Sequence, residues 1–498
     1  MLKLFKNIKM KNIIIITILS FFLASCGITK RDFEGRSNVN VQDDFLNSNF
    51  QNEAFTKAEI AKTWWSEFKD PILDTLIEKA RKHNLDINSA VANFYASRAL
   101  LKETKFDRVP TVTANGDYTR TRLGENVFVQ GSNPTFNTYN SSFDAFWEAD
   151  VFGRVSNRIK GAYANNQLAL ADMQGVYVSI FAETANNYME LRGTQYLLNI
   201  ANRNLKGQQD TYDLTVQLSE AGTSNGLDVS RALAQLENTR ATIPPLKARI
   251  EALKNSLSVL IGEVPGDLDL AVVDEQPLPS LPTSVALGNI NELLRRRPDV
   301  RRAEAELQIQ IAKYNLSVAE LYPKIQFGGS IGFSAVDFSN FGSKESFTWS
   351  IMPNISWAAF NLGRVKQQIK RDDAWTLAAL NQYEKAVLQG LEEIKTALSN
   401  YSNELQRREI LKTSSKASAE ADRFAKQRFN AGLDSFIDYL SAENTLLQSE
   451  NLLATSEISA ATSLIAIYKA LGGGWEIISE KELNNKFKKM KLKEVSSK

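Results

Sequence analysis

Two long stretches of the chain carry apolar residues at helical spacing. Residues 154–221 and 364–431 each span 68 positions without a proline, and at a rise of 1.5 Å per residue each would form a helix of roughly 100 Å. Apolar positions in the second stretch step by three or four, which is typical of a coiled-coil-like seam. These positions are Leu380, Tyr383, Val387, Leu391, Ile394, Leu398, Tyr401 and Leu405. We therefore predict two helices much longer than an average globular helix.

Each long helix is predicted to end in a chain reversal and a returning helix. Gly222 and Gly432 stand at the reversals, where glycine accepts a left-handed backbone. The apolar positions of the first return are Ile243, Leu246, Ile250, Leu253, Leu257 and Leu260. Pro244 and Pro245 interrupt this return, while Ala454 stands 210 positions after Pro244. We expect a broken return helix in the first half and a more continuous one in the second.

Between the helices, four segments of about ten residues alternate apolar and polar positions. Their apolar positions are Val112, Ala114 and Tyr118; Phe143, Ala145, Trp147 and Ala149; Ile325, Phe327, Ile331 and Phe333; and Phe347, Trp349, Ile351, Ile355 and Trp357. A soluble β-sandwich would alternate as well, but the segment length and the aromatic residues at the strand ends favour membrane strands. Four strands cannot close a barrel, and open edges cannot lie in lipid. We therefore predict that three copies share a barrel of twelve strands.

The two halves of the chain repeat each other. Leu85-Asp86 corresponds to Pro298-Asp299 at an offset of 213, and later landmarks correspond at an offset of 210. The later pairs are Gly153-Arg154 with Gly363-Arg364, Ala221-Gly222 with Ala431-Gly432, and Ile261-Gly262 with Leu471-Gly472. The conserved order indicates a duplication of one structural unit.

Composition excludes several classes of site. The 498 residues include one cysteine and one histidine, His83, which leaves no Cys/His metal site and no intrachain disulfide. The formal net charge is +2, and removing the four lysines of residues 1–25, which contain no acid, takes it to −2. A nearly neutral mature chain gives no electrostatic support to a nucleic-acid partner.

The N-terminus carries an export signal. Four lysines precede an apolar run from Ile13 to Ala24, which is too short to span a membrane as a helix. The run ends in Leu23-Ala24-Ser25-Cys26, which resembles a bacterial lipobox with Cys26 as the acylated residue. The next residue is Gly27 rather than Asp, which does not favour retention at the inner membrane. We expect a signal peptide over residues 1–25 and a lipidated tether over 26–62.

Several motifs together resemble the outer-membrane factor lipoproteins of tripartite efflux pumps, the TolC-like family. They are Trp64-Trp65-Ser66-Glu67-Phe68, Trp147-Glu148-Ala149-Asp150-Val151-Phe152-Gly153-Arg154, Arg296-Arg297-Pro298-Asp299-Val300, Ala319-Glu320-Leu321-Tyr322-Pro323 and Tyr468-Lys469-Ala470-Leu471-Gly472. The resemblance covers roughly residues 60–475. It implies a mainly α-helical fold with membrane β-strands: a homotrimer with a 12-stranded outer-membrane barrel and long helical hairpins that form a periplasmic tunnel. A periplasmic adaptor and an inner-membrane transporter, usually proton-driven, are the implied partners.

The duplication and the composition divide the chain, and the resemblance points to sites. Residues 63–265 form the first repeat, 266–284 an equatorial linker, 285–475 the second repeat and 476–498 a flexible basic tail. The implied periplasmic gate consists of Asp228, Arg231, Asp438 and Tyr439. The implied adaptor contacts at the hairpin tips are Ala221, Gly222, Thr223, Ala431, Gly432 and Leu433. Ser441 stands where many relatives carry a second acid, which predicts a weaker acidic constriction.

No motif for an energy source or for catalysis is present. The sequence contains neither a phosphate-binding loop with Lys-Ser or Lys-Thr nor a hydrolase nucleophile elbow. We therefore expect a passive conduit for drugs or other small toxic compounds, without enzyme activity, metal or cofactor, lipid-anchored in the outer membrane. Two alternatives share many features: the outer component of a type I protein or peptide secretion system, and a lipid-anchored periplasmic coiled-coil scaffold. Substrate and pump identity are not encoded in the chain.

Overall fold

A computed structural model describes residues 30–33, 39, 54–124, 135–268, 272, 274, 276–289 and 294–496. The predicted signal peptide over residues 1–25 and the predicted acylation site Cys26 lie outside the described residues. Contacts divide the chain into two compact units. The first unit holds residues 97–166 and 304–381 with the start of the chain, and the second holds 37–96, 167–303 and 382–498.

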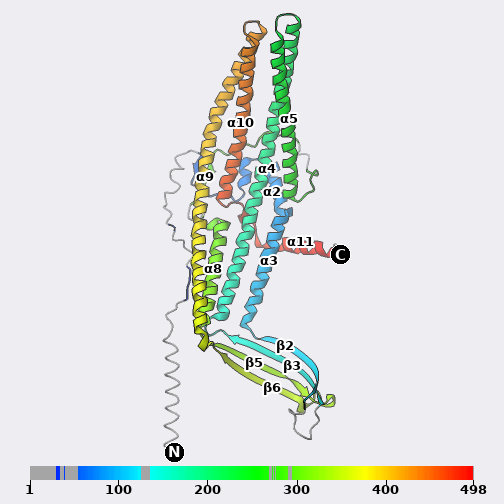
Figure 1. Cartoon of the computed structure of the whole chain (residues 1–498), viewed down its shortest axis with the longest axis vertical. Helices are drawn as coiled ribbons and strands as arrows, with labels where there is room; N and C mark the ends of the chain where they lie inside the picture. Colours follow the sequence, from blue (N-terminus) through cyan, green and yellow to red (C-terminus); the bar gives the residue numbers. More distant parts are fainter. Residues whose placement is uncertain are drawn as a thin grey trace, which may run out of the picture. The chain divides into compact units, whose positions relative to one another are not determined.

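The first unit contains a four-stranded antiparallel sheet with the order β2-β3-β5-β6 (Figure 1). The strands are β2 (Thr111–Arg122), β3 (Thr135–Ala149), β5 (Lys324–Ala335) and β6 (Phe347–Ser356). They coincide with the four alternating segments, so the prediction of four strands is confirmed. Strands from the two sequence repeats pair with each other through β3 and β5.

The register of the sheet separates apolar and polar side chains onto opposite faces. Ala114 pairs with Phe143, Phe143 with Ile331, and Ile331 with Trp349, which makes one row across all four strands. The three large side chains of this row are 60%, 51% and 68% exposed, respectively. The adjacent row is polar and consists of Thr113, Asp144, Ser330 and Ser350. Because successive side chains point to opposite faces, one face of the sheet exposes an apolar surface.

Hydrogen bonds and ion pairs join the ends of two helices to the sheet in the first unit. The Asp150 carboxylate accepts hydrogen bonds from the backbone N–H groups of Val155 and Ser156 at the start of α4 (Arg154–Glu220). Arg154 forms ion pairs with Glu148 of β3 and with Glu320, which follows α8 (Pro298–Ala319). These contacts fix the point where the chain leaves β3 and enters α4.

The second unit contains most of the helical hairpins, whose long helices begin in the first unit (Figure 1). α4 returns through α5 (Gly226–Ile261), and α9 (Leu362–Asn430) returns through α10 (Phe436–Ala470). α4 has 67 residues and α9 has 69, which confirms the two long helices. Two shorter helices precede the sheet, α2 (Pro71–His83) and α3 (Leu85–Lys105). Among the described residues, no helix combines the length and the apolar character needed to cross a membrane.

A buried aromatic and ionic core lies at the base of the hairpins in this unit. Trp64 stacks on Tyr468 with ring centroids 5.1 Å apart. Arg297 is buried, forms ion pairs with Asp299 and Glu393, and donates to the carbonyl oxygen of Ala470. A buried guanidinium is tolerated because several acceptors satisfy it.

The expectation of a broken return helix in the first half is wrong. α5 runs without interruption through Pro244 and Pro245. Each proline removes a backbone hydrogen bond to the preceding turn, but both prolines are exposed, and Arg240 and Ala241, whose carbonyls lose these bonds, are exposed too. Water can therefore replace the lost donors, while the buried Ile243 keeps this segment of the helix packed.

The ends of the chain also differ from expectation. The predicted flexible tail over 476–498 is wrong for residues 480–496, because α11 (Glu480–Ser496) forms there and buries Leu483. The prediction of a tether over residues 26–62 is wrong near the end of that range. There β1 (Phe55–Thr56) pairs in parallel with β4 (Val285–Ala286), and Phe55 is buried. In both places a few apolar residues in a polar stretch provide the burial that orders the backbone.

Candidate functional site

The two hairpin tips have the same backbone. At the first tip the N–H of Gly222 bonds to Ser219 O and the N–H of Thr223 to Leu218 O. At the second, Gly432 and Leu433 make the same bonds to Phe429 O and Arg428 O. This pattern is a Schellman motif, which requires a left-handed residue, and both glycines have it, with φ of 73° and 70°. The predicted reversals are confirmed.

The returning helices also begin alike. Asn225 caps α5 by accepting from the N–H of Asp228, and Ser435 caps α10 by accepting from the N–H of Asp438. The two aspartates therefore occupy equivalent positions in the first helical turn, where a negative charge is stabilised by the helix dipole.

The predicted gate residues lie in different surroundings. Asp228 pairs with Arg231 within α5, with 3.7 Å between oxygen and nitrogen. Asp438 is exposed and accepts from the Ser435 hydroxyl at 2.5 Å, and it forms no ion pair within the described part of the chain. The structure thus brings Asp228 and Arg231 together but leaves Asp438 available at its tip.

Tyr439 joins the two hairpins. Its side chain is buried, and its hydroxyl forms a hydrogen bond of 3.1 Å with Oγ1 of Thr211 in α4. The ring stacks on Phe429 of α9 at 5.6 Å and 14° between planes. Apolar residues of four helices complete this cluster, namely Ala232, Phe436, Tyr212, Ala425 and Leu440. Near the tips the two hairpins are therefore held by one buried aromatic cluster and a polar bond.

An acidic pair beside Tyr439 escaped the sequence analysis. Glu443 Oε1 accepts from the Tyr439 hydroxyl at 3.4 Å. Burial, and then the charge of Asp422 on α9, raise the pKa of Glu443 to about 7. Burial also raises the pKa of Asp422. The sequence could have pointed to Glu443, because it follows Tyr439 by one helical turn. Nothing in the sequence indicates that Asp422 lies close to Glu443.

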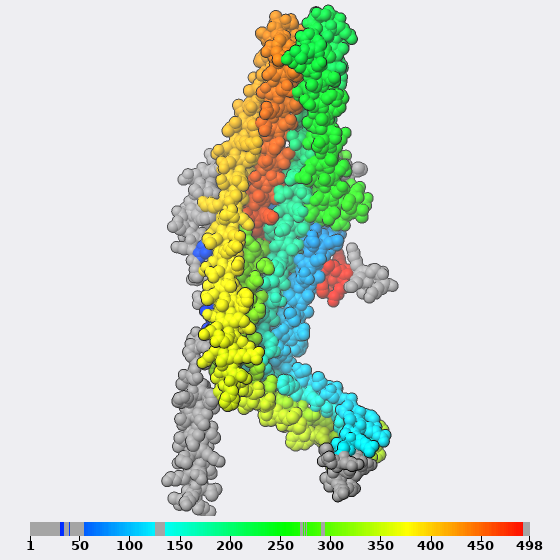
Figure 2. Space-filling view, viewed as in Figure 1, coloured from blue at the N-terminus to red at the C-terminus, as the bar shows by residue number. Residues whose placement is uncertain are grey.

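The predicted adaptor contacts are all exposed. Ala221, Gly222 and Thr223 lie at the first tip, and Ala431, Gly432 and Leu433 at the second. Figure 2 shows these tips as the green and orange ends of the hairpins. Leu433 is 68% exposed. A bidentate ion pair between Arg428 and Asp434, at 2.6 and 2.7 Å, stiffens the second tip. Small residues and one exposed leucine suit contact with another protein surface.

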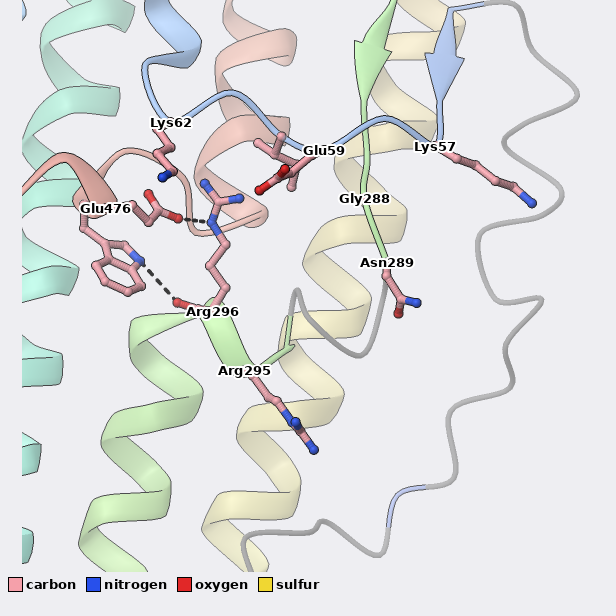
Figure 3. A pocket seen from close by; sticks show the side chains of 10 residues that line it. Lys57, Glu59, Lys62, Gly288, Asn289, Arg295, Arg296 and Glu476 are labelled. Atoms are coloured by element: carbon pink, nitrogen blue, oxygen red, sulfur yellow. Dashed lines mark hydrogen bonds and ion pairs between the residues drawn. The ribbon is translucent and has the colours of Figure 1, made fainter.

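A separate pocket of about 620 Å³ lies at the base of the second unit (Figure 3). Its lining includes Lys57, Lys62, Arg295, Arg296 and Glu476. Arg296 forms an ion pair with Glu476, and Figure 3 shows Lys57 and Arg295 pointing away from the Arg296 guanidinium. The Lys62 and Arg296 head groups point toward each other, but the carboxylates of Glu59 and Glu476 lie beside them, so positive charge does not accumulate at this point of the pocket.

Comparisons with known proteins agree on one family. The family model described as outer membrane efflux protein matches residues 76–263 and 289–473. The probable efflux pump outer membrane protein TtgC of Pseudomonas putida is 26% identical over 472 residues, covering 93% of this chain and 96% of the relative. The solvent efflux pump outer membrane protein SrpC of Pseudomonas putida is 28% identical over 415 residues, covering 82% and 87%.

A similar solved structure is that of the outer-membrane channel OprN. It matches with a TM-score of 0.84 at 33% identity and covers 90% of this chain and 99% of the OprN chain. The long hairpins and the four-stranded sheet thus occur together in a known outer-membrane channel.

Proposed function

This chain belongs to the outer membrane efflux protein family, and from this premise we propose that three copies assemble into one channel. Its place is the outer membrane and its function is efflux. Each copy contributes one four-stranded sheet, and three sheets give the twelve strands that close a barrel.

The exposed apolar row of the sheet carries this proposal. Phe143, Ile331 and Trp349 expose more than half of their surface on one face, while the adjacent row is polar. Lipid outside and water inside account for this pattern. β2 and β6 are the ends of the strand order, and within the described part of the chain each pairs along one side. Neighbouring copies would pair with these edges, since lipid does not tolerate unpaired backbone groups.

The remaining roles follow from this assembly. Cys26 carries the lipid anchor, and the channel is a passive conduit that needs no catalysis or cofactor. A periplasmic adaptor binds the exposed tips at Gly222 and Gly432. A partner supplies the work, because the sequence of this chain holds no phosphate-binding loop. We propose a proton-driven inner-membrane transporter for this role.

We assign the gate to the region where the hairpins meet. Threefold symmetry makes Asp228 and Asp438 into rings of three carboxylates, which attract cations. Arg231 neutralises part of the first ring through its ion pair. Tyr439 holds the hairpins together through Thr211, so opening requires this hydrogen bond to break.

A gene deletion tests the proposed function. The deletion strain should become more susceptible to dyes, detergents and antibiotics, and a plasmid copy of the chain should restore resistance. Unchanged susceptibility to every compound at normal expression would refute the efflux role. Native mass spectrometry of the purified protein tests the assembly, and a monomer or dimer would refute the trimer.

A further inference from the structure

One face of the C-terminal helix α11 is docked onto its unit. Leu483 is buried, and Phe487 stacks on Tyr95 of α3 with ring centroids 4.2 Å apart and 10° between the planes. The Tyr95 hydroxyl donates to Oδ1 of Asn484 at 2.5 Å. The apolar side chains of this helix are therefore already engaged in the fold.

Polar contacts fix the same helix at the end of α2. Nζ of Lys486 donates to the carbonyl oxygen of Arg81 at 2.6 Å, and Glu482 forms an ion pair with the Arg81 guanidinium. The last carbonyls of a helix lack partners within it, so a lysine is well placed there. Burial, and then the nearby Arg81, lower the pKa of Lys486 to about 8.

The other side of α11 is cationic and exposed. Lys481, Lys488 and Lys489 are exposed there, and within the described residues none of them forms an ion pair with a carboxylate. Lys491 is exposed too, but it follows Phe487 by one helical turn, and its Nζ lies 5.0 Å from the centroid of that ring, at the edge of the docked face. Figure 1 shows that α11 extends outward beyond α2 toward the C-terminus. A docked helix thus presents a fixed group of positive charges to its surroundings.

We propose that α11 binds the carboxylate-rich polymer of the cell wall, peptidoglycan, through Lys481, Lys488 and Lys489. This inference rests on the proposed function, which places the second unit in the periplasm. Single exposed ion pairs are weak, so a ligand with repeated carboxylates is favoured because several lysines on each of three copies bind it together.

A lipid surface fits this helix less well. Amphipathic helices bind membranes by burying an apolar face in the interface. In α11 that face is occupied, because Leu483 is buried and Phe487 is stacked on Tyr95. What remains outside is charge, which suits a hydrated polyanion.

Cosedimentation of the full-length protein with purified sacculi tests the proposal. The triple variant Lys481→Gln, Lys488→Gln and Lys489→Gln should lose about tenfold in sacculus binding, since each exposed ion pair contributes a small amount. Wild-type binding should also fall as salt is added. The matched control replaces three exposed lysines of α4 and α9 by glutamine and should bind like the wild type. These control lysines are Lys206, Lys412 and Lys416.

Equal binding by the wild type and the triple variant would overturn the proposal. So would binding to phosphatidylglycerol vesicles in preference to sacculi. Complementation of the deletion strain separates a failure of this proposal from a failure of the proposed efflux function. A chain that restores resistance without binding sacculi contradicts only this inference, and a chain that binds sacculi without restoring resistance contradicts only the efflux role.

Discussion

Replacing Glu443 by glutamine should stabilise the hairpin contact at neutral pH. Glu443 Oε2 and Asp422 Oδ1 are buried without a hydrogen-bond partner in the described part of the chain. Asp422 and Lys426 of α9, together with Tyr439 of α10, are the titratable groups that influence Glu443. Ionised Glu443 therefore lies in a poorly solvated place beside a second acid, with Lys426 as the cation that partly offsets it.

The size of this stabilisation follows from the pKa of Glu443. Folding raises the pKa of Glu443 from 4.5 to about 7, and one unit corresponds to 1.36 kcal/mol, so ionisation costs the folded contact about 3 kcal/mol. The folded state binds more protons than the unfolded state between these values. Stability of the contact therefore falls as pH rises from about 4.5 to 7 and is constant outside this window.

Hydrogen exchange of the peptide covering residues 436–450 measures this effect. After correction for intrinsic rates, wild-type protection should fall by about two orders of magnitude between pH 4.5 and pH 7.5, as 3 kcal/mol requires. Glu443→Gln should keep high protection at both pH values. The exposed Glu409→Gln serves as a control and should behave like the wild type. If Glu443→Gln and wild type showed the same pH dependence, the buried acid would not be its cause.

Three further predictions concern the tips, the gate and the anchor. Tyr439→Phe should lower the stability of the hairpin contact by about 1 kcal/mol and raise the open probability of the channel in planar bilayers. Thr211→Val should have the same effect, and the double variant should open no more often than Tyr439→Phe alone. Additive effects of the two substitutions would contradict a hydrogen bond shared by these two side chains. Gly432→Ala should strain the left-handed turn by about 1 kcal/mol and weaken adaptor binding in surface plasmon resonance. Gly226→Ala, at a position without a positive φ, should leave adaptor binding unchanged. Equal losses of adaptor binding in both variants would show that the left-handed turn is not the cause. Cys26→Ser should abolish labelling by an alkyne fatty acid, and persistent labelling would place the anchor elsewhere.

Elements with a repeated period were predictable from the sequence. The seam through Tyr383, Val387 and Leu391 continues over many turns, and the structure buries all three side chains. The alternation around Phe143 likewise locates a strand of 15 residues. A long regular pattern specifies both the element and the side that is buried, because the two periods of 3.6 and 2 are distinct.

Features that depend on tertiary contacts were not predictable. Pro244 and Pro245 look like a helix break, but exposure of the affected carbonyls removes the penalty of burying them unpaired. Phe487 looks like one aromatic residue in a basic tail until Tyr95, 392 positions earlier, provides its partner. The bond between Thr211 and Tyr439 joins residues 228 positions apart. Pairings of this kind arise from the fold and leave no local pattern.

The two hairpin tips have matching backbones, and this determines which surface they offer to a partner that binds several tips at once. In the proposed trimer, six reversals would carry the same Schellman hydrogen bonds, so the main chain at the tips would repeat six times within a threefold assembly. The side chains alternate, because Thr223 follows the glycine at one tip and Leu433 at the next. A partner with six equal subunits could dock on every tip through the shared main chain, whereas a partner that recognises the leucine would bind at three places.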